Sequence, residues 1–160
     1  MKNELSRGDE VYGNDVFQIL LEYEVSRSVR YPTPLGILHI EMTPAGSDEA
    51  TLHTAPKIFT AALNAHLRSV DIPSGSGRVY KILLPTTNET GLKSVCERLL
   101  SVFKNKFNTQ SGNSIAFSLN IGATSHAGGE TLTRELLLNN AEAALKQSKS
   151  KGSNTFAIST

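Results

Sequence analysis

The segment from Pro73 to Pro85, PSGSGRVYKILLP, combines residue types found in phosphate-binding turns with those found in strands. Glycines such as Gly75 and Gly77 let the backbone approach a phosphate closely, but glycine-rich turns also simply reverse the chain in a hairpin. The apolar run that follows, VYKILLP, predicts a strand that Pro85 ends. The segment by itself leaves both interpretations open, an active-site loop or a plain hairpin.

The other residues with potential chemistry are scattered. Cys96 is the only cysteine, so there is no internal disulfide, and it falls on an apolar helical stripe that predicts a core residue. No Cys/His cluster has the spacing of metal ligands, and we assign no chemistry to the histidines. These are His39, His53, His66 and His126. The sequence therefore predicts neither a metal site nor a bound cofactor.

Composition predicts one globular domain. The chain has 160 residues, of which 39% are hydrophobic and 19% charged, enough for a single buried core. The net charge of +1 gives no electrostatic signature of a nucleic-acid partner. No apolar run approaches the roughly 20 residues of a membrane span, and the N-terminus lacks the apolar centre of a secretion signal. We expect a cytoplasmic protein that is not inserted in a membrane.

The elements that must position these residues follow from apolar periodicity and from capping residues. Residues 1–13 are polar and predict a leader or linker. Predicted helices begin at Val16, at Pro56, after the cap Asn88, and after a cap at Thr131 or Thr133, the last ending at Gly152. Predicted strands cover 35–42, 79–85, 114–123 and the final NTFAIS, while 43–54 reads as a loop. This order predicts an α/β sandwich (α+β) of the ferredoxin-like kind, a central sheet flanked by helices with one extra element at each end.

Four segments in order resemble the GGDEF domain of bacterial diguanylate cyclases. The clearest are SLNIGAT (118–124) and ELLLNNAEAALKQSKSKGSN (135–154), which resemble the strand, loop and helix that close that domain. FQILLEYEVSRSVRYPTPLGILHIEM (17–42) resembles its opening helix and first strand. The resemblance implies a nucleotide-cyclase-type sheet and a single, degenerate GGDEF-type domain over residues 14–160.

The resemblance places the glycine turn on the family's active-site signature. Aligning ILLP (82–85) with the family's corresponding strand puts SGRVY on the five positions of Gly-Gly-Asp-Glu-Phe, namely Ser76, Gly77, Arg78, Val79 and Tyr80. Family members join two GTP molecules with the help of a divalent metal held by carboxylates. Valine offers no lone pair to a cation, and Arg78 brings a positive charge to the place of the metal. The implied site has lost its acidic turn.

The remaining family positions are also mostly replaced. The first-strand carboxylates correspond to Glu41 and Thr43, and the phosphate-binding Phe-Lys pair to Ala45-Gly46. Lys149 matches a phosphate-contacting lysine of the C-terminal helix. Glu41 and Lys149 are therefore either remnants of an active site or an ordinary exposed glutamate and a solvated lysine near a helix C-terminus. We expect the chain not to be an enzyme.

One implied binding site survives. Arg68-Ser69-Val70-Asp71, expected at the end of a helix, matches the family's R-x-x-D product-inhibition site for cyclic di-GMP, and Arg98 lies where relatives often supply a second arginine. A guanidinium can stack on guanine or bind its O6/N7 edge, and a carboxylate can accept from guanine N–H groups. The alternative is a surface ion pair between residues three apart, which binds nothing.

Three functions compete. The first is a cyclic di-GMP effector without catalytic activity, which acts on an unidentified bacterial signalling protein. The second is a nucleotide-independent interaction module whose contact surface includes an exposed Arg78, Val79 and Tyr80. The third, which we regard as the weakest, is a residual cyclase or a GTP-binding regulator that retains Glu41.

Overall fold

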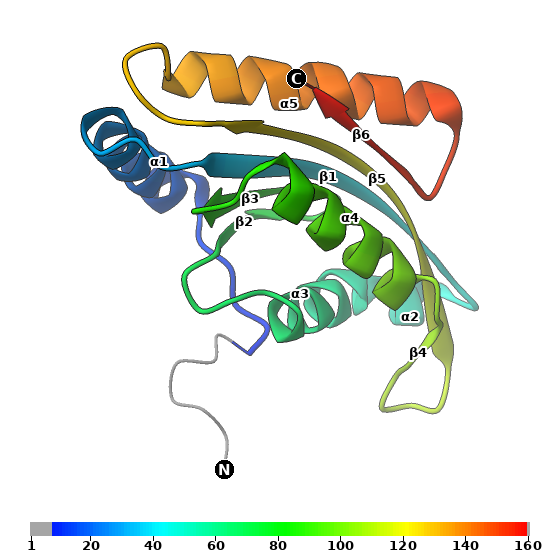
Figure 1. The fold of residues 1–160 in the computed structure, drawn as a ribbon. Helices are drawn as coiled ribbons and strands as arrows, with labels where there is room; N and C mark the ends of the chain where they lie inside the picture. The colour runs from blue at the N-terminus through cyan, green and yellow to red at the C-terminus, as the bar shows by residue number, and fades with distance from the viewer. Residues whose placement is uncertain (1–7, 160) are drawn as a thin grey trace.

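A computed structural model describes residues 8–159 of the protein, and Figure 1 shows their arrangement. In chain order the elements are α1 (Asn14–Arg30), β1 (Leu35–Gly46), α2 (Glu49–His53), α3 (Ala55–Ala65), β2 (Ile72–Ser76), β3 (Val79–Pro85), α4 (Glu89–Phe103), β4 (Phe107–Asn108), β5 (Ser114–His126), α5 (Arg134–Lys151) and β6 (Thr155–Ser159).

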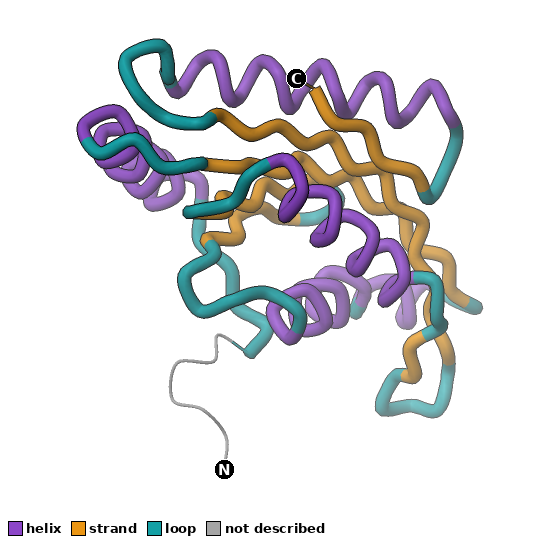
Figure 2. Tube along the Cα trace, viewed as in Figure 1, coloured by secondary structure: helices purple, strands orange, loops and turns teal. Residues whose placement is uncertain are grey.

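The strands form one six-stranded sheet in the order β2-β3-β1-β5-β4, with β6 also beside β5. Neighbouring strands are antiparallel except β5 and β6, which are parallel. Every residue of β1 from Leu35 to Ile40 is buried, because β1 lies in the centre of the sheet with helices on both of its faces. The strands and the covering helices can be followed in Figure 2.

Two apolar clusters sit on opposite faces of the sheet. Helices α3 and α4 cover one face, where Phe59 stacks on Phe103 with ring centroids 4.7 Å apart and lies in one apolar cluster with Leu38 and Ile40 of β1. Helices α1 and α5 cover the other face, where Phe17 and Leu137 lie in one cluster with the alternate residues of β1. This layering confirms the predicted α/β fold class, a central sheet flanked by helices.

The predicted capping residues are confirmed. Asn88 accepts a hydrogen bond from the backbone N–H of Gly91 at 2.9 Å, and Thr133, not Thr131, caps α5 by accepting from Leu136 at 3.0 Å. Gly152 ends α5 with a φ of 109°, a conformation that favours glycine.

The prediction of a loop over residues 43–54 was wrong. Strand β1 continues to Gly46, which pairs with Ile115 of β5, and α2 follows, with Asp48 accepting from the N–H of Thr51 at 2.7 Å. The extension rests on pairing with a strand about seventy residues away in the sequence, which local propensity does not report. Helix α3 also ends at Ala65, short of the predicted Leu67.

Residues 8–13, in the predicted leader, run along the domain. The side-chain amide of Asn64 donates to the carbonyls of Gly8 and Glu10, and Tyr12 N–H donates to the Pro73 carbonyl at 2.9 Å. The rest of the predicted leader, residues 1–7, lies outside the described residues. Within residues 8–159, no helix is long and apolar enough to cross a membrane.

Candidate functional site

The glycine turn is a tight hairpin in which Gly77 and Arg78 connect β2 to β3. Ser76 pairs with Val79 across the hairpin, and Gly77 has a φ of 63°. A side chain at Gly75 would place its Cβ 2.4 Å from the Val79 carbonyl oxygen, so glycine is required there by both φ and space. The Arg78 carbonyl accepts from Met42 N–H at 2.8 Å, which ties the turn to β1.

The hairpin exposes Arg78 and Val79, but the expectation of an exposed Tyr80 was wrong. Tyr80 is 1% exposed, its ring lies 4.8 Å from that of Phe59, and its hydroxyl donates to the Gly77 carbonyl at 2.8 Å. Burial raises the pKa of Tyr80 to about 12. The strand alternates between faces, so with Val79 outside, Tyr80 must point into the core. Tyr80 therefore supports the turn from the core side and is not available for contact with a partner.

Glu41 and Lys149, the two predicted remnants, form an ion pair. Lys149 Nζ lies 2.7 Å from Glu41 Oε2 and 3.3 Å from Oε1. The pair joins β1 to the last turns of α5, and both side chains remain partly exposed. The Glu41 carboxylate and the Lys149 ammonium neutralise each other, so the two residues link the strand to the helix.

Gly122 of β5 allows α5 to lie close enough for this contact. A Cβ at Gly122 would meet the backbone N of Leu145 at 2.1 Å and the Ala141 carbonyl at 2.5 Å. Because these are backbone atoms of a packed helix, they cannot move aside as a side-chain tip would. The small residue in SLNIGAT therefore sets the distance between helix and sheet.

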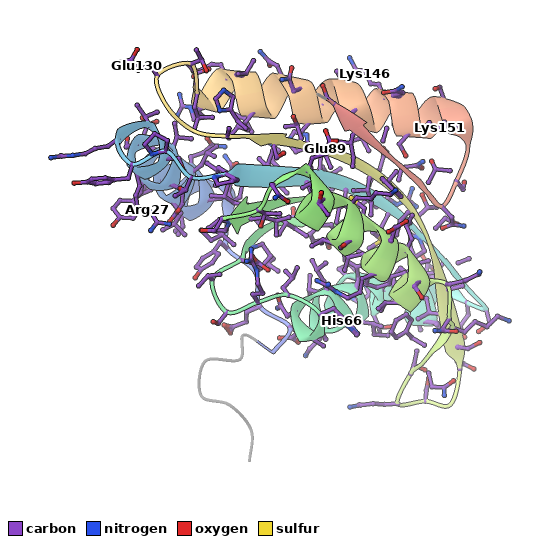
Figure 3. All side chains as sticks on the ribbon, viewed as in Figure 1. Arg27, His66, Glu89, Glu130, Lys146 and Lys151 are labelled. Atoms are coloured by element: carbon purple, nitrogen blue, oxygen red, sulfur yellow. The ribbon has the colours of Figure 1, made fainter. Side chains whose placement is uncertain are left out.

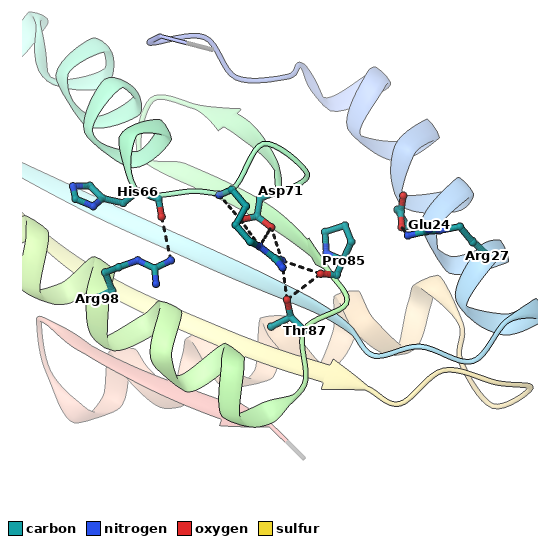
Figure 4. Close-up of polar contacts among 8 residues, drawn as sticks. Glu24, Arg27, His66, Asp71, Pro85, Thr87 and Arg98 are labelled. Atoms are coloured by element: carbon teal, nitrogen blue, oxygen red, sulfur yellow. Dashed lines mark hydrogen bonds and ion pairs between the residues drawn. The ribbon is translucent and has the colours of Figure 1, made fainter. Parts of the chain in front are cut away.

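Arg68 and Asp71 form a clasp between two loops (the Arg68–Asp71 clasp), shown in Figure 4. Asp71 Oδ1 accepts from Arg68 Nη2 at 2.7 Å and Nε at 3.1 Å, while Oδ2 accepts from the Arg68 backbone N–H at 2.8 Å. Arg68 Nη2 also donates to the Pro85 carbonyl at 2.8 Å and to Thr87 Oγ1 at 2.9 Å. The clasp thus connects the α3–β2 loop to the β3–α4 loop.

Burial within the clasp is uneven. The Asp71 side chain is 1% exposed, whereas that of Arg68 is 48% exposed. The prediction that this motif ends a helix was wrong: α3 ends at Ala65, and Arg68 to Asp71 form a turn in which Asp71 N–H donates to the Arg68 carbonyl at 3.1 Å. This geometry holds the carboxylate inside and leaves half of the arginine side chain at the surface.

Arg98 approaches the same loop from α4. Its Nη2 donates to the His66 carbonyl at 3.1 Å, directly after the end of α3 (Figure 4). Figure 3 shows His66 where α3 faces α4. The fold therefore brings all three predicted ligand residues to the 66–71 loop, although Arg98 lies about thirty residues further along the chain.

Sequence reasoning missed two participants. Thr87 and the Pro85 carbonyl complete the clasp, and no local pattern marks them, because their role depends on the approach of two loops.

His39, to which we assigned no chemistry, is 3% exposed, and its Nε2 has no hydrogen-bond partner within the described part of the chain. Burial, together with the nearby Lys81, lowers the pKa of His39 to about 4.

His39 also lies 3.9 Å from a carboxylate oxygen of Glu142 on α5, which would favour the protonated imidazole. Glu142 is 60% exposed, so water weakens that attraction and burial decides the protonation state. Over residues 8–159, no three His, Cys, Asp or Glu side chains gather in a way that could hold a metal ion.

No family model matches the sequence, and a search of curated proteins finds no match. Solved structures do match, although their sequences are only distantly similar. The GGDEF domain of FimX from Pseudomonas aeruginosa aligns with a TM-score of 0.76 at 15% identity, over 99% of this chain and 97% of that one. The coiled coil and GGDEF domain of DgcB from Caulobacter crescentus, in complex with c-di-GMP, aligns with a TM-score of 0.76 at 13% identity, over 99% of this chain and 85% of that one.

The diguanylate cyclase SiaD from Pseudomonas aeruginosa, in complex with its activator SiaC, aligns with a TM-score of 0.76 at 19% identity. The alignment covers 99% of this chain and 61% of SiaD, so the chain spans less than two thirds of that protein. At these identities the likeness concerns the fold. The chain has the mixed α/β fold of GGDEF cyclase-like domains.

Proposed function

We propose that this chain is a catalytically inactive GGDEF-type signalling domain that binds cyclic di-GMP through Arg68 and Arg98, with Asp71 holding Arg68 in place. The observation that best supports it is that the guanidinium groups of Arg68, in the loop, and of Arg98, on α4, both donate hydrogen bonds to residues of the 66–71 loop. A cyclic dinucleotide offers guanine edges and two phosphates, the chemistry that arginine recognises by stacking and by forked hydrogen bonds.

The contacts indicate a different role for each of these residues. Both Asp71 oxygens are engaged by Arg68, so Asp71 is a positioning residue that holds the guanidinium in a fixed orientation. The exposed half of Arg68 and the exposed Arg98 then make contact with the ligand. A preorganised arginine loses little side-chain entropy on binding, which favours affinity.

Features of the turn and of the ion pair support inactivity. Arg78 and Val79 occupy positions at which the resemblance implies acidic residues, and Glu41 is neutralised by Lys149 at 2.7 Å. We expect no dinucleotide product when the protein is incubated with labelled GTP and Mg²⁺ or Mn²⁺. Formation of cyclic di-GMP in that assay would contradict this part of the proposal.

Isothermal titration with cyclic di-GMP tests the binding. Arg98→Ala is the informative variant, because Arg98 makes one exposed hydrogen bond and its loss leaves the clasp intact. We expect the wild type to bind and Arg98→Ala to bind about tenfold more weakly. Arg78→Ala, which removes an exposed arginine of the hairpin, is the matched control and should bind like the wild type. No heat with the wild type at about 100 µM ligand would end the proposal.

We further propose that the domain contacts a partner protein. SiaD, of similar fold, is known in complex with its activator SiaC. A nucleotide-independent interaction module is the second candidate, and the observation in its favour is the 54% exposure of Val79 at the tip of the hairpin. Partner capture that is indifferent to cyclic di-GMP and lost in Val79→Asp would support it. Tyr80→Ala is unsuitable for this test because Tyr80 belongs to the core.

A further inference from the structure

Helix α1 carries apolar side chains on the face that points away from the sheet. Phe17, Leu21 and Val25 are buried against the sheet, yet Val16, Ile19 and Tyr23 are 45%, 68% and 64% exposed. Large apolar side chains gathered on an outer helix face are uncommon on a monomer and mark an interaction surface.

The spacing of this outer stripe is that of a coiled-coil seam. Val16, Ile19, Tyr23, Ser26 and Arg30 follow one another at intervals of three, four, three and four residues. These are the a and d positions of a heptad repeat, along which two helices pack side by side. Beside the stripe is a shallow hollow of about 500 Å³ that Ile19, Tyr23 and Ser26 line together with Arg134 of α5.

The charges along α1 favour a second copy of the same helix running in the opposite direction. Asp15 lies in the first turn, and Arg27 and Arg30 lie in the last. In a parallel pair the two Arg30 side chains of the seam would meet. In an antiparallel pair each Arg30 lies just beyond the other helix's N-terminus, about one turn from its Asp15, and the helix dipoles are opposed favourably. Figure 3 shows Arg27 on this outer side of α1.

The charges flanking the seam do not require a parallel arrangement. Arg27 is paired with Glu24 at 2.9 Å, and Glu22 lies 3.3 Å from Arg134. The charges of Arg27 and Glu22 are therefore already neutralised within one copy. We propose that two copies of this chain associate through antiparallel packing of their α1 helices along the stripe Val16, Ile19, Tyr23, Ser26 and Arg30. In this arrangement Val16 lies opposite Ser26 of the second copy, and Ile19 lies opposite Tyr23.

Sedimentation equilibrium over a concentration series up to about 1 mM tests the association, which is expected to be weak because the apolar seam is short. Ile19→Lys should weaken dimerisation by about tenfold or more, since the dimer would then hold two lysine charges in the seam, one from each copy. Leu52→Lys changes another exposed aliphatic side chain, but on α2, and should dimerise like the wild type. A wild type that stays monomeric throughout, or an Ile19→Lys variant that dimerises normally, would overturn the proposal.

Disulfide trapping tests the direction. Cys96 is buried and burial raises its pKa to about 12, so an introduced cysteine is the reactive thiol. Val16→Cys and Ser26→Cys are oxidised separately and as a mixture. The proposal predicts a cross-linked dimer chiefly in the mixture. Efficient cross-linking of each variant with itself would show a parallel pair and would contradict the antiparallel arrangement.

Discussion

The Arg68–Asp71 clasp and the Glu41–Lys149 pair are built from the same two kinds of charge, but they differ in burial and in connectivity. Asp71 is 1% exposed and is held by side-chain and backbone donors of Arg68, which also reaches Pro85 and Thr87. Glu41 and Lys149 are 33% and 51% exposed and contact mainly each other. The comparison teaches that a pair of opposite charges organises a site only where one member is desolvated and shares several partners.

Gly122→Ala should have the largest effect, because it acts on the helix that carries Lys149 to Glu41. The new Cβ would overlap backbone atoms of α5, so we expect a loss of more than about 3 kcal/mol in the free energy of unfolding. Urea denaturation measures it. Gly112→Ala, in a turn with open space around the glycine but a φ of 87°, is a control for backbone strain alone and should cost about 1 kcal/mol. Similar losses in both variants would contradict the proposed close approach.

Asp71→Ala should come next. It removes a buried partner of Arg68 and opens the connection between the α3–β2 and β3–α4 loops, so we expect unfolding to become easier by about 3 kcal/mol. This loss is at the lower end of the range for breaking a buried ion pair, because Arg68 is 48% exposed and water can solvate it once Asp71 is removed. A loss below about 1 kcal/mol in urea denaturation would place the clasp in the same class as an exposed pair.

His39 lies on the same strand as Glu41, and its burial predicts that the free energy of unfolding depends on pH. Its pKa of about 4 in the folded protein is below the 6.5 of an ordinary histidine, so the unfolded chain binds a proton first as the pH falls. The stability that neutral His39 contributes is complete above pH 6.5 and is lost between about 6.5 and 4, by up to about 3 kcal/mol.

Urea denaturation at several pH values, compared with His39→Leu, isolates this contribution. The variant should lose the part of the slope that lies between pH 6.5 and 4, whereas His53→Asn, at an exposed position, should retain it. An unchanged slope in His39→Leu would show that His39 is not the titrating group.

The Glu41–Lys149 pair should give the smallest effect. A double-mutant cycle of Glu41→Gln and Lys149→Met is expected to yield a coupling of about 0.5 kcal/mol, reduced further in 1 M salt because the pair is partly exposed. A coupling above about 2 kcal/mol would remove the difference between the two regions.

Periodicity and capping residues predicted most of the fold, since the apolar spacing of α1 and α4 and the caps Asn88 and Thr133 are encoded within a few residues. The errors concern features that depend on distant partners. Strand β1 extends to Gly46 because β5 pairs with it, and Tyr80 is buried because α3 brings Phe59 over it. The grouping of Arg68, Asp71 and Arg98 was implied by a family resemblance, whereas Thr87 and the orphaned His39 could only be found in three dimensions.

Hydrogen exchange with and without cyclic di-GMP tests the central claim most directly, because it compares the 66–71 loop with the hairpin tip in one experiment. The account predicts slower amide exchange at residues 69–71 and in the neighbouring turn of α4 around Arg98, with no change at residues 76–79. Protection of the hairpin tip alone, or no change in either region at saturating ligand, would contradict it.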